Sequence, residues 1–309
     1  MRNSIVIGTR GSKLALVQAG MVIERLKQLA PGSEIRTEEI TTHGDRNQQI
    51  SLERLESTGV FVKDIEEALL SGRIDLAVHS LKDVPTEIPR GLKLAAVLER
   101  GDPRDVLVTR GPNLATLPAG ARIGTSSLRR SIQLKGLRAD VELCSIRGNV
   151  DTRLRKVDTG EYDGAILAAA GLVRLGCADR IVQYLPLETY LPAVGQAALV
   201  IETRADDMEL LALLQRLNHL PTWQAVTAER FFLYELGGGC QAPIAALGTI
   251  QGDKLILEGM VASIRHNRLL RASETGSADK PERVGKRLAA RLVRMGAVDF
   301  INEAKQNDG

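Results

Sequence analysis

The sequence predicts an α/β protein in which two α/β domains enclose a cleft and a smaller α+β domain follows them. Its 309 residues exceed what one ordinary hydrophobic core accommodates, which indicates two or three domains. Short β-rich runs alternate with helical patterns as far as residue 169, and this alternation is typical of βαβ units. The texture changes near residue 221, where a long helical pattern precedes two long strand patterns.

The first domain is predicted at residues 1–99, with residues 197–217 returning to it. Apolar residues recur at helical spacing in its first helix, and the pattern ends before Pro31 and Gly32. We expect its βαβ units to form a mostly parallel sheet. The expected strands are residues 4–8, 34–42, 75–80, 92–98 and 198–203, and the expected helices are residues 13–29 and 62–70.

The second domain is predicted at residues 103–192, after a linker at residues 100–104. Gly and Pro interrupt the pattern in this linker and again at residues 191–195, which we interpret as a second hinge. Two α/β domains joined by two crossing segments form a cleft, where ligands of such folds bind. The expected strands are residues 106–109, 121–124, 141–146 and 165–169, and the expected helices are residues 127–135 and 150–157.

The third domain is predicted at residues 220–309 and carries the most informative residue, Cys240. Three glycines precede this thiol and Pro243 stops a helix from continuing through it, so a bulky group can reach the sulfur. This favours an attachment point, and the alternative is a small buried hydrophobic residue. The expected helices are residues 222–236, 281–295 and 297–305, and the expected strands are residues 244–251 and 254–263.

Composition excludes several classes of protein. Aromatic residues make up 3% of the chain, which argues against a stacking surface for single-stranded nucleic acid. The three cysteines form no CxxC pair and the four histidines are scattered, so we expect reduced thiols and no metal site. The N-terminus lacks a signal-peptide core, and no apolar stretch approaches the roughly 18 residues that span a bilayer. We therefore expect a cytoplasmic protein.

Basic residues are concentrated in one window of the chain. Between Arg122 and Lys156 there are nine basic and three acidic residues, which is a local charge of +6. Because the net charge of the whole chain is +3, the remainder carries −3. Such a concentration of positive charge, in a chain that is otherwise mildly acidic, predicts an anionic ligand.

Three strand-to-helix turns place polar residues where an anion would bind. The turn at residues 8–12 carries Arg10 and the N-cap candidate Ser12. Arginine binds carboxylates through paired, charge-assisted hydrogen bonds. The alternatives are a simple capped loop and a solvated basic face. The other two turns, at residues 124–130 and 147–153, contain Thr125, Ser127, Arg129, Arg130, Arg147 and Arg153.

A carboxylate follows the buried strand expected at residues 75–80. Lys82 and Asp83 stand side by side in the segment His-Ser-Leu-Lys-Asp-Val-Pro at residues 79–85. A carboxylate at the carboxyl end of a strand can stabilise a cation or exchange a proton. A structural ion pair, or a turn aspartate before Val-Pro, is the alternative.

Taken together, these segments resemble those of porphobilinogen deaminases, also called hydroxymethylbilane synthases. They occur in the family's order and span nearly the whole chain. The matching segments are Val-His-Ser-Leu-Lys-Asp-Val-Pro at 78–85, Gly-Thr-Ser-Ser-Leu-Arg-Arg at 124–130, Arg-Gly-Asn-Val at 147–150, Leu-Pro-Ala-Val-Gly-Gln at 191–196 and Gly-Gly-Cys-Gln at 238–241.

The resemblance implies a transferase of tetrapyrrole and haem biosynthesis with two periplasmic-binding-protein-like domains. Such an enzyme joins four porphobilinogen molecules head to tail, and four ammonia molecules leave as hydroxymethylbilane is made. The resemblance also implies a dipyrromethane cofactor held by a thioether to Cys240, so that twelve carboxylates enter one cleft as the product grows. It also implies a monomer. The low aromatic content and the lack of a long apolar stretch lead us to expect neither a nucleic-acid nor a membrane partner.

The resemblance assigns roles to individual residues. Asp83 is expected to accept hydrogen bonds from pyrrole N–H groups, to stabilise the cation left by loss of ammonia and to manage protons. Phe61 is expected in a lid over the cleft. Two positions depart from the family: Thr58 replaces a common lysine, and Gly237 replaces an acidic residue, so we expect a more flexible loop there. The cofactor-binding positions are Ser80, Lys82, Thr125, Ser127, Arg129 and Arg130, and the substrate-binding positions are Arg10, Ser12, Arg147, Arg153 and Arg174.

Two other functions fit parts of the sequence. Solute receptors and the effector domains of transcription regulators also have two α/β lobes with crossing hinges, and they bind organic anions without chemistry. That hypothesis gives no reason for the Gly-Gly-Cys loop or for Lys82 beside Asp83. A nucleic-acid-binding protein could use the basic window, but arginines in short turns suit small anions better. A covalently retained pyrrole adduct distinguishes the enzyme from both.

Overall fold

The structure is a computed structural model that describes residues 2–42, 62–238, 242–263, 265–266 and 268–306. In these residues the strands form three sheets, and the chain divides into two compact units. Unit 1 comprises residues 1–100 and 198–223, and unit 2 comprises residues 101–197 and 224–309. The predicted mixed α/β fold is confirmed.

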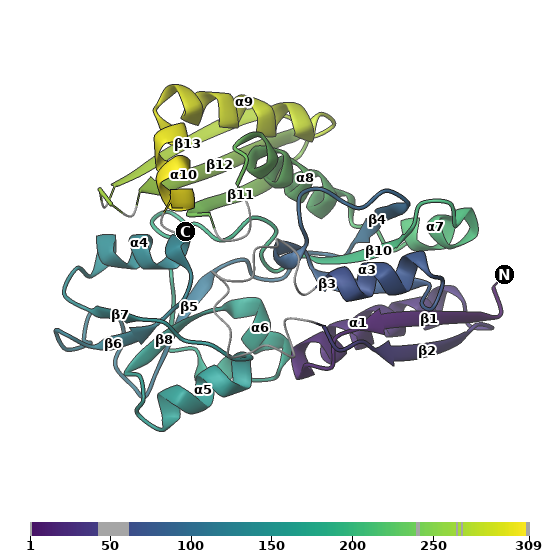
Figure 1. Ribbon diagram of the computed structural model, residues 1–309, viewed down its shortest axis with the longest axis horizontal. Helices are drawn as coiled ribbons and strands as arrows, with labels where there is room; N and C mark the ends of the chain where they lie inside the picture. The colour runs from purple at the N-terminus through teal and green to yellow at the C-terminus, as the bar shows by residue number, and fades with distance from the viewer. Residues whose placement is uncertain (1, 43–61, 239–241, 264, 267, 307–309) are drawn as a thin grey trace. The chain divides into compact units, whose positions relative to one another are not determined.

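Unit 1 is built on a five-stranded sheet with the order β2-β1-β3-β10-β4 (Figure 1). The late strand β10 inserts between β3 and β4, so the chain returns to the first sheet after residues 101–197 of unit 2. The strands are β1 (Ser4–Thr9), β2 (Glu34–Glu39), β3 (Leu76–Ser80), β4 (Leu92–Val97) and β10 (Leu199–Arg204).

The prediction of a mostly parallel sheet is wrong for half of the pairings. β1 is parallel to β2 and to β3, whereas β10 is antiparallel to both of its neighbours. The reason lies in where β10 begins: Leu199 pairs with Ser80, the last residue of β3, so β10 runs back along β3. The apolar pattern of a buried strand reports burial on both faces and does not encode direction.

Helices cover both faces of this sheet. α1 (Lys13–Leu29) and α7 (Met208–Gln215) share a core with Leu76 and Val78 of β3. α3 (Lys63–Leu70) shares a different core with Ala77 of the same strand. Because successive side chains of a strand point to opposite faces, His79 lies on the face that α3 covers.

Unit 2 contains a second five-stranded sheet with the order β7-β6-β8-β5-β9. β6 is parallel to β7 and β8, while β5 is antiparallel to β8 and β9. The first and second sheets therefore repeat one mixed pattern. The elements are β5 (Asp105–Thr109), β6 (Arg122–Gly124), α4 (Leu128–Leu137), β7 (Glu142–Cys144), α5 (Val150–Asp158), β8 (Gly164–Ala168), α6 (Ala169–Arg174) and β9 (Gln183–Tyr184).

The third sheet also lies in unit 2 and is antiparallel. Three helices pack on one face of it, and Ile132 of α4 contacts the apolar residues of the other face (Figure 1). The sequence did not predict β13, because this edge strand is mostly polar and half-exposed. The elements are α8 (Leu220–Glu235), β11 (Ile244–Gln251), β12 (Lys254–Ser263), β13 (Arg268–Ser277), α9 (Pro281–Arg294) and α10 (Ala297–Gln306).

Gly237 ends α8 in a specific way. Its φ is +61°, its N–H donates to the Tyr234 carbonyl, and the Gly238 N–H donates to the Leu233 carbonyl. This pair of hydrogen bonds around a left-handed glycine is a Schellman motif. At Gly237 itself the backbone is therefore held by a helix cap, and glycine is favoured there by its positive φ.

Replacing Gly237 with alanine is expected to lower the free energy of unfolding by about 1–2 kcal/mol, because an L-residue resists this conformation. Gly20→Ala is the control. Gly20 lies inside α1 and a Cβ there meets nothing within 4 Å, so alanine should raise stability by about 0.5–1 kcal/mol. Urea denaturation measures both changes, and equal effects of the two variants would contradict the cap.

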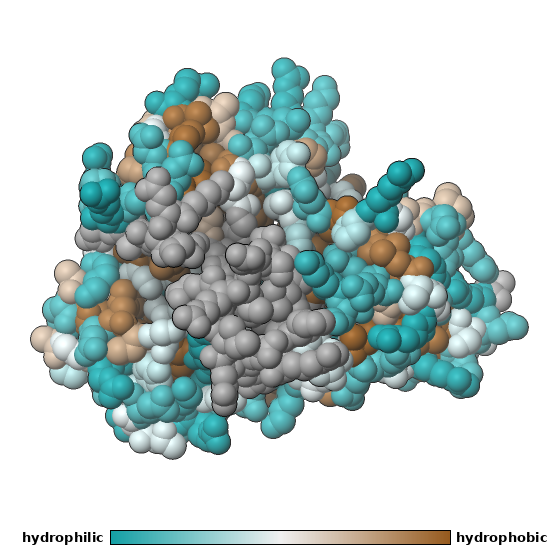
Figure 2. Space-filling model, viewed as in Figure 1, coloured by the Kyte–Doolittle hydropathy of each residue, from teal (hydrophilic) through white to brown (hydrophobic). Residues whose placement is uncertain are grey.

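On the face in Figure 2, hydrophobic residues form separate patches among hydrophilic ones. Within the described ranges, no helix is both long and apolar enough to cross a membrane.

Candidate active site

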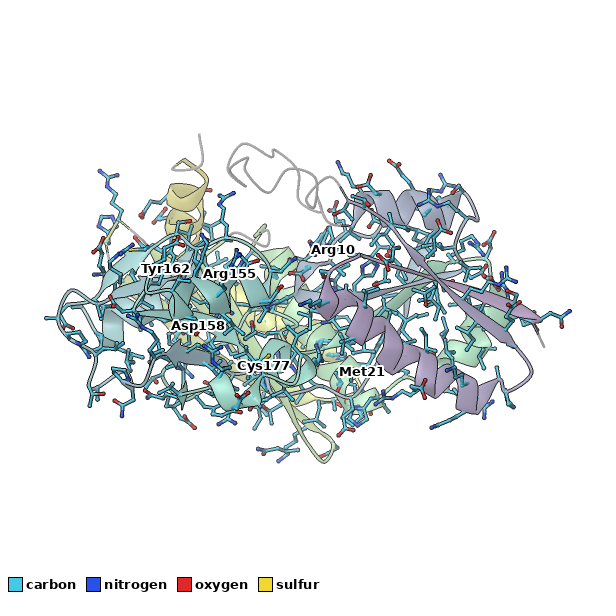
Figure 3. The ribbon with its side chains drawn as sticks, turned by 90° about the horizontal axis from the view of Figure 1, so that it is seen from below. Arg10, Met21, Arg155, Asp158, Tyr162 and Cys177 are labelled. Carbon is cyan, nitrogen blue, oxygen red and sulfur yellow. The ribbon has the colours of Figure 1, made fainter. Side chains whose placement is uncertain are left out.

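The predicted site residues lie in both units. In unit 1, Arg10 directly follows β1 and Ser80 ends β3. These strands are parallel, with Gly8 paired to Ala77, so their carboxyl ends meet at one edge of the sheet. Figure 3 shows Arg10 at this edge, beside the start of α1. The structure therefore brings Arg10 and Ser80 to the same end of the first sheet.

Ser12 forms the predicted cap of α1. Its side-chain oxygen accepts a hydrogen bond from the Ala15 N–H at 3.3 Å, and its backbone is extended. A capped helix N-terminus carries partial positive charge and favours anions. Beside it, the buried Gln18 donates from Nε2 to the Ser80 hydroxyl at 2.9 Å. The sequence did not predict this contact, which joins α1 to the end of β3.

Lys82 and Asp83 lie on the short 3₁₀ turn η2 (Leu81–Asp83) that follows β3. Leu81 is 2% exposed, and its N–H donates to the Ala198 carbonyl at 3.0 Å. The Val84 N–H then closes the turn on the Leu81 carbonyl at 3.1 Å. Leu81 therefore anchors the turn inward, while Asp83 is exposed and available to a ligand.

In unit 2, the corresponding turns follow the parallel strands β6 and β7. The Thr125 N–H donates to the Cys144 carbonyl at 2.8 Å, and the Ser127 N–H donates to the Thr125 hydroxyl at 3.2 Å. Ser126 joins the two turns, because its hydroxyl lies 2.9 Å from that of Ser145 and donates to the Ile146 carbonyl at 2.8 Å. Thr125 and Ser127 thus lie at the edge of the second sheet where hydrogen bonds join the turns after β6 and β7.

The side chains of Arg129 and Arg130 point inward from α4. They are 4% and 7% exposed, and both bind the fully buried Asp105. Arg129 Nη1 lies 2.7 Å from one carboxylate oxygen, and Arg130 Nη2 lies 2.6 Å from the other. The sequence predicts an anion site at these two arginines and does not reveal their partner Asp105. A buried acid at the start of an apolar strand is the signal that could have revealed it.

Asp105 is the centre of a buried polar cluster. Gln196 also donates to it at 3.1 Å, and the Tyr190 hydroxyl donates to the Arg130 carbonyl at 2.8 Å. Although burial alone would raise the pKa of Asp105, the two guanidinium groups hold it well below its usual range. Two guanidinium groups face one carboxylate, so this cluster keeps one net positive charge.

The remaining predicted arginines occupy three different environments in unit 2. Arg153 Nε donates to the Gly148 carbonyl at 2.8 Å, which ties α5 to the preceding turn. Arg147 is half-buried in that turn. Arg174 ends α6 and donates to the Ala197 carbonyl at 2.5 Å, and burial lowers its pKa to about 10. In Figure 3, Arg155 and Tyr162 mark the region of α5.

Cys240, Phe61 and Thr58 lie outside the described residues. The described chain approaches Cys240 from the Schellman motif at the end of α8 and leaves it towards β11. Gly238 is tightly enclosed, since a Cβ there would clash with Cδ1 of Ile244.

Comparison with known proteins decides the family. Residues 5–212 match the family model described as "Porphobilinogen deaminase, dipyromethane cofactor binding domain", and residues 223–294 match "Porphobilinogen deaminase, C-terminal domain". The chain belongs to the porphobilinogen deaminase family. A porphobilinogen deaminase from Desulforudis audaxviator is 49% identical over 97% of this chain and 98% of its own length. One from Pelotomaculum thermopropionicum is 46% identical over 100% and 99%.

Membership of the porphobilinogen deaminase family confirms several predictions. The family's enzymes are hydroxymethylbilane synthases, which are transferases of tetrapyrrole biosynthesis acting on porphobilinogen. The matched model names a dipyrromethane cofactor domain, so the predicted enzyme class and cofactor are confirmed. Among solved structures, the methionine-binding protein MetQ is similar over 74% of this chain and 92% of its own, with 14% identity and a TM-score of 0.45.

Proposed function

We propose that this chain joins four porphobilinogen molecules head to tail on a dipyrromethane linked to Cys240, and releases hydroxymethylbilane and four ammonia molecules. Family membership over nearly the full length supports the reaction class. The single structural observation that carries the proposal is the positively charged, buried cluster at Arg129 and Arg130, because the substrate, cofactor and product are all polycarboxylates.

The residues of unit 2 fit a dipyrromethane with acetate and propionate side chains. The Asp105 cluster retains one positive charge. Of the three guanidinium nitrogens of Arg129, only Nη1 donates hydrogen bonds to the described part of the chain. The other nitrogens of Arg129 can therefore bind a carboxylate, with hydroxyl groups of Thr125 and Ser127 nearby on the same turn. Ser80 and Lys82 of unit 1 are the further proposed partners. When bound, the cofactor supplies the anchored pyrrole to which the first substrate is joined.

Asp83 is the proposed catalytic residue. Its carboxylate is exposed on a turn that the buried Leu81 fixes, so it is available and held in one place. A preorganised negative charge stabilises positive charge that develops on a pyrrole as ammonia leaves. The same carboxylate can accept hydrogen bonds from pyrrole N–H groups and hold a proton in transit.

The proposed substrate-binding residues provide cationic groups and a helix start. Arg10 and Ser12 stand at the N-terminus of α1, and Arg147 and Arg153 stand at the start of α5. Arg174 is also proposed to bind the growing product, although in the structure its guanidinium contacts the Ala197 carbonyl.

We further propose a lid that contains Phe61, and a cytoplasmic monomer without a nucleic-acid or membrane partner. The proposed domains are residues 1–99 with 197–217, residues 103–192 and residues 220–309.

The stoichiometry of the reaction tests this function. We expect the purified protein to consume four porphobilinogen molecules and release four ammonia molecules for each hydroxymethylbilane. Ammonia and porphobilinogen are followed by enzymatic and colorimetric assays, and the product by its cyclisation to uroporphyrinogen. Saturable porphobilinogen binding without ammonia release would overturn the proposal in favour of an anion-binding protein, the second candidate that two α/β units support.

A further inference from the structure

A buried group of one histidine and two glutamates lies behind the strand that carries Ser80. His79 is on β3, Glu202 on β10 and Glu66 on α3, and they are 6%, 0% and 6% exposed. Glu202 pairs with Ala77, so Glu202 and His79 project to the same face of the sheet, which α3 covers. All three belong to unit 1.

The contacts of this group leave two carboxylate oxygens unsatisfied. His79 Nε2 lies 2.9 Å from Oε2 of Glu202. Oε1 of Glu202 and Oε1 of Glu66 are buried and have no hydrogen-bond partner in the described part of the chain. Buried acceptors without partners are rare and costly, and each one requires an explanation. A metal ion is not supported, since the described residues contain no suitable group of three ligands.

The charges around Glu66 indicate which carboxylate holds a proton. Burial raises the pKa of Glu66 most strongly, and the negative charge of Glu202 raises it further. His79 and Lys63, which is on the exposed side of α3, act in the opposite direction, and the raising effects prevail. These three groups are the charged or titratable neighbours that act on Glu66. Glu66 can therefore hold a proton at a higher pH than an ordinary glutamate does.

We propose that Glu66 and Glu202 share one proton in the folded protein, and that this pair holds His79, and through it the turn carrying Asp83, in place. The proton resides on Glu66 and is donated to Oε1 of Glu202, directly or through one water, while Oε2 of Glu202 faces His79. One proton thereby satisfies both orphan oxygens and leaves a single negative charge beside the imidazole.

Only a few backbone residues separate His79 from the proposed site residues Ser80 and Asp83. His79 directly precedes Ser80, and Asp83 follows three residues later on η2. Glu66 and Glu202 are thus positioning residues that act through His79 and touch no substrate. This inference rests on the proposed function for its effect on turnover, whereas the shared proton is a property of the protein without substrate.

The sign of the pH dependence follows from the raised pKa of Glu66. Its favourable contribution to stability is complete below the unfolded pKa near 4.3 and is lost as the pH rises through the folded value. Glutamine at this position stays neutral and can donate to Glu202 at every pH. The melting temperature of Glu66→Gln relative to wild type should therefore increase as the pH rises.

Infrared spectroscopy of the substrate-free protein tests the shared proton. The wild type should show the C=O band of a protonated carboxylic acid at a pH above the range in which exposed glutamates ionise, and Glu66→Gln should lack it. Glu67→Gln is the matched control, because Glu67 is exposed on the same helix and its replacement should leave the band intact. Absence of the band from the folded wild type, or its persistence in Glu66→Gln, overturns the proposal.

Turnover tests the positioning role. As the pH rises, kcat of the wild type should fall, and the midpoint of this fall should equal the pH at which half of the band is lost. KM should change less than about twofold over the same range. The kcat of Glu66→Gln should not show that decline. A decline unchanged in Glu66→Gln overturns the positioning role. If Glu66→Gln does not fold, Glu202→Gln replaces it and must move the band to a lower pH midpoint. A folded wild type that lacks the band but turns over normally overturns this inference alone, and a wild type that shows the band but has no turnover overturns the proposed function alone.

Discussion

Replacing Asp83 with asparagine is expected to lower kcat about 10²- to 10³-fold, which corresponds to roughly 3–4 kcal/mol of lost transition-state stabilisation. Asparagine keeps the shape of the side chain and one acceptor oxygen, but it removes the negative charge that we propose stabilises a developing pyrrole cation. The turn should remain folded, because its anchors are Leu81 and backbone hydrogen bonds. Steady-state hydroxymethylbilane formation measures the effect.

The matched control for this prediction is Glu87→Gln. Glu87 is exposed, four residues further along the same connection, and has no proposed role, so its kcat should stay within about twofold of wild type. The mass that the cofactor adds to the protein and the melting temperature should be the same in both variants as in the wild type. A near-wild-type kcat for Asp83→Asn would remove Asp83 from the mechanism.

Asp105→Asn is expected to destabilise the protein by about 3–5 kcal/mol, because it leaves two buried guanidinium groups without their counter-charge. For a unit of this size, each kcal/mol lowers the melting temperature by roughly 2–4 °C. Thermal or urea unfolding measures the loss. Cofactor content should also fall, because Arg129 and Arg130 lose the group that orients them.

The control is Asp102→Asn, the same change three residues earlier. The pair between Asp102 and Arg104 is partly exposed, with side chains 27% and 40% accessible, and its removal should cost about 0.2–1 kcal/mol. The lowered pKa of Asp105 also sets a pH window. Its contribution is complete above the unfolded pKa near 3.9 and is lost as the pH falls towards the folded value. If Asp105→Asn lowered the free energy of unfolding at pH 7 by no more than Asp102→Asn does, the stabilising role of the buried ion cluster would be refuted.

Much of the fold could be predicted from periodicity. The run at residues 13–29 predicts α1 over the range that the structure shows, because apolar spacing and a breaking Pro-Gly pair fix both ends. Strand direction could not be predicted, since β10 is antiparallel for a topological reason that its own residues do not encode. β13 was missed because a half-exposed edge strand lacks a buried apolar pattern.

The candidate site was predictable in its chemistry and less so in its contacts. Motifs placed Ser12, Asp83 and Arg129 at the carboxyl ends of strands, where the structure has them. The partners of these residues come from distant segments: Asp105 lies 24 residues before Arg129, and Gln18 lies 62 residues before Ser80. Such pairings depend on how helices and strands pack against one another in the folded protein, so no local sequence pattern predicts them. The buried Glu66 and Glu202 went unnoticed for the same reason.

The most direct test of the central claim is the intact mass of the denatured wild-type protein measured beside Cys240→Ser. We predict an added mass of two linked pyrrole units on the wild type, after incubation with porphobilinogen if the protein is purified unloaded, and no added mass on Cys240→Ser. A wild type that gains no mass from porphobilinogen or hydroxymethylbilane, or a serine variant that carries the same adduct, would contradict the claim.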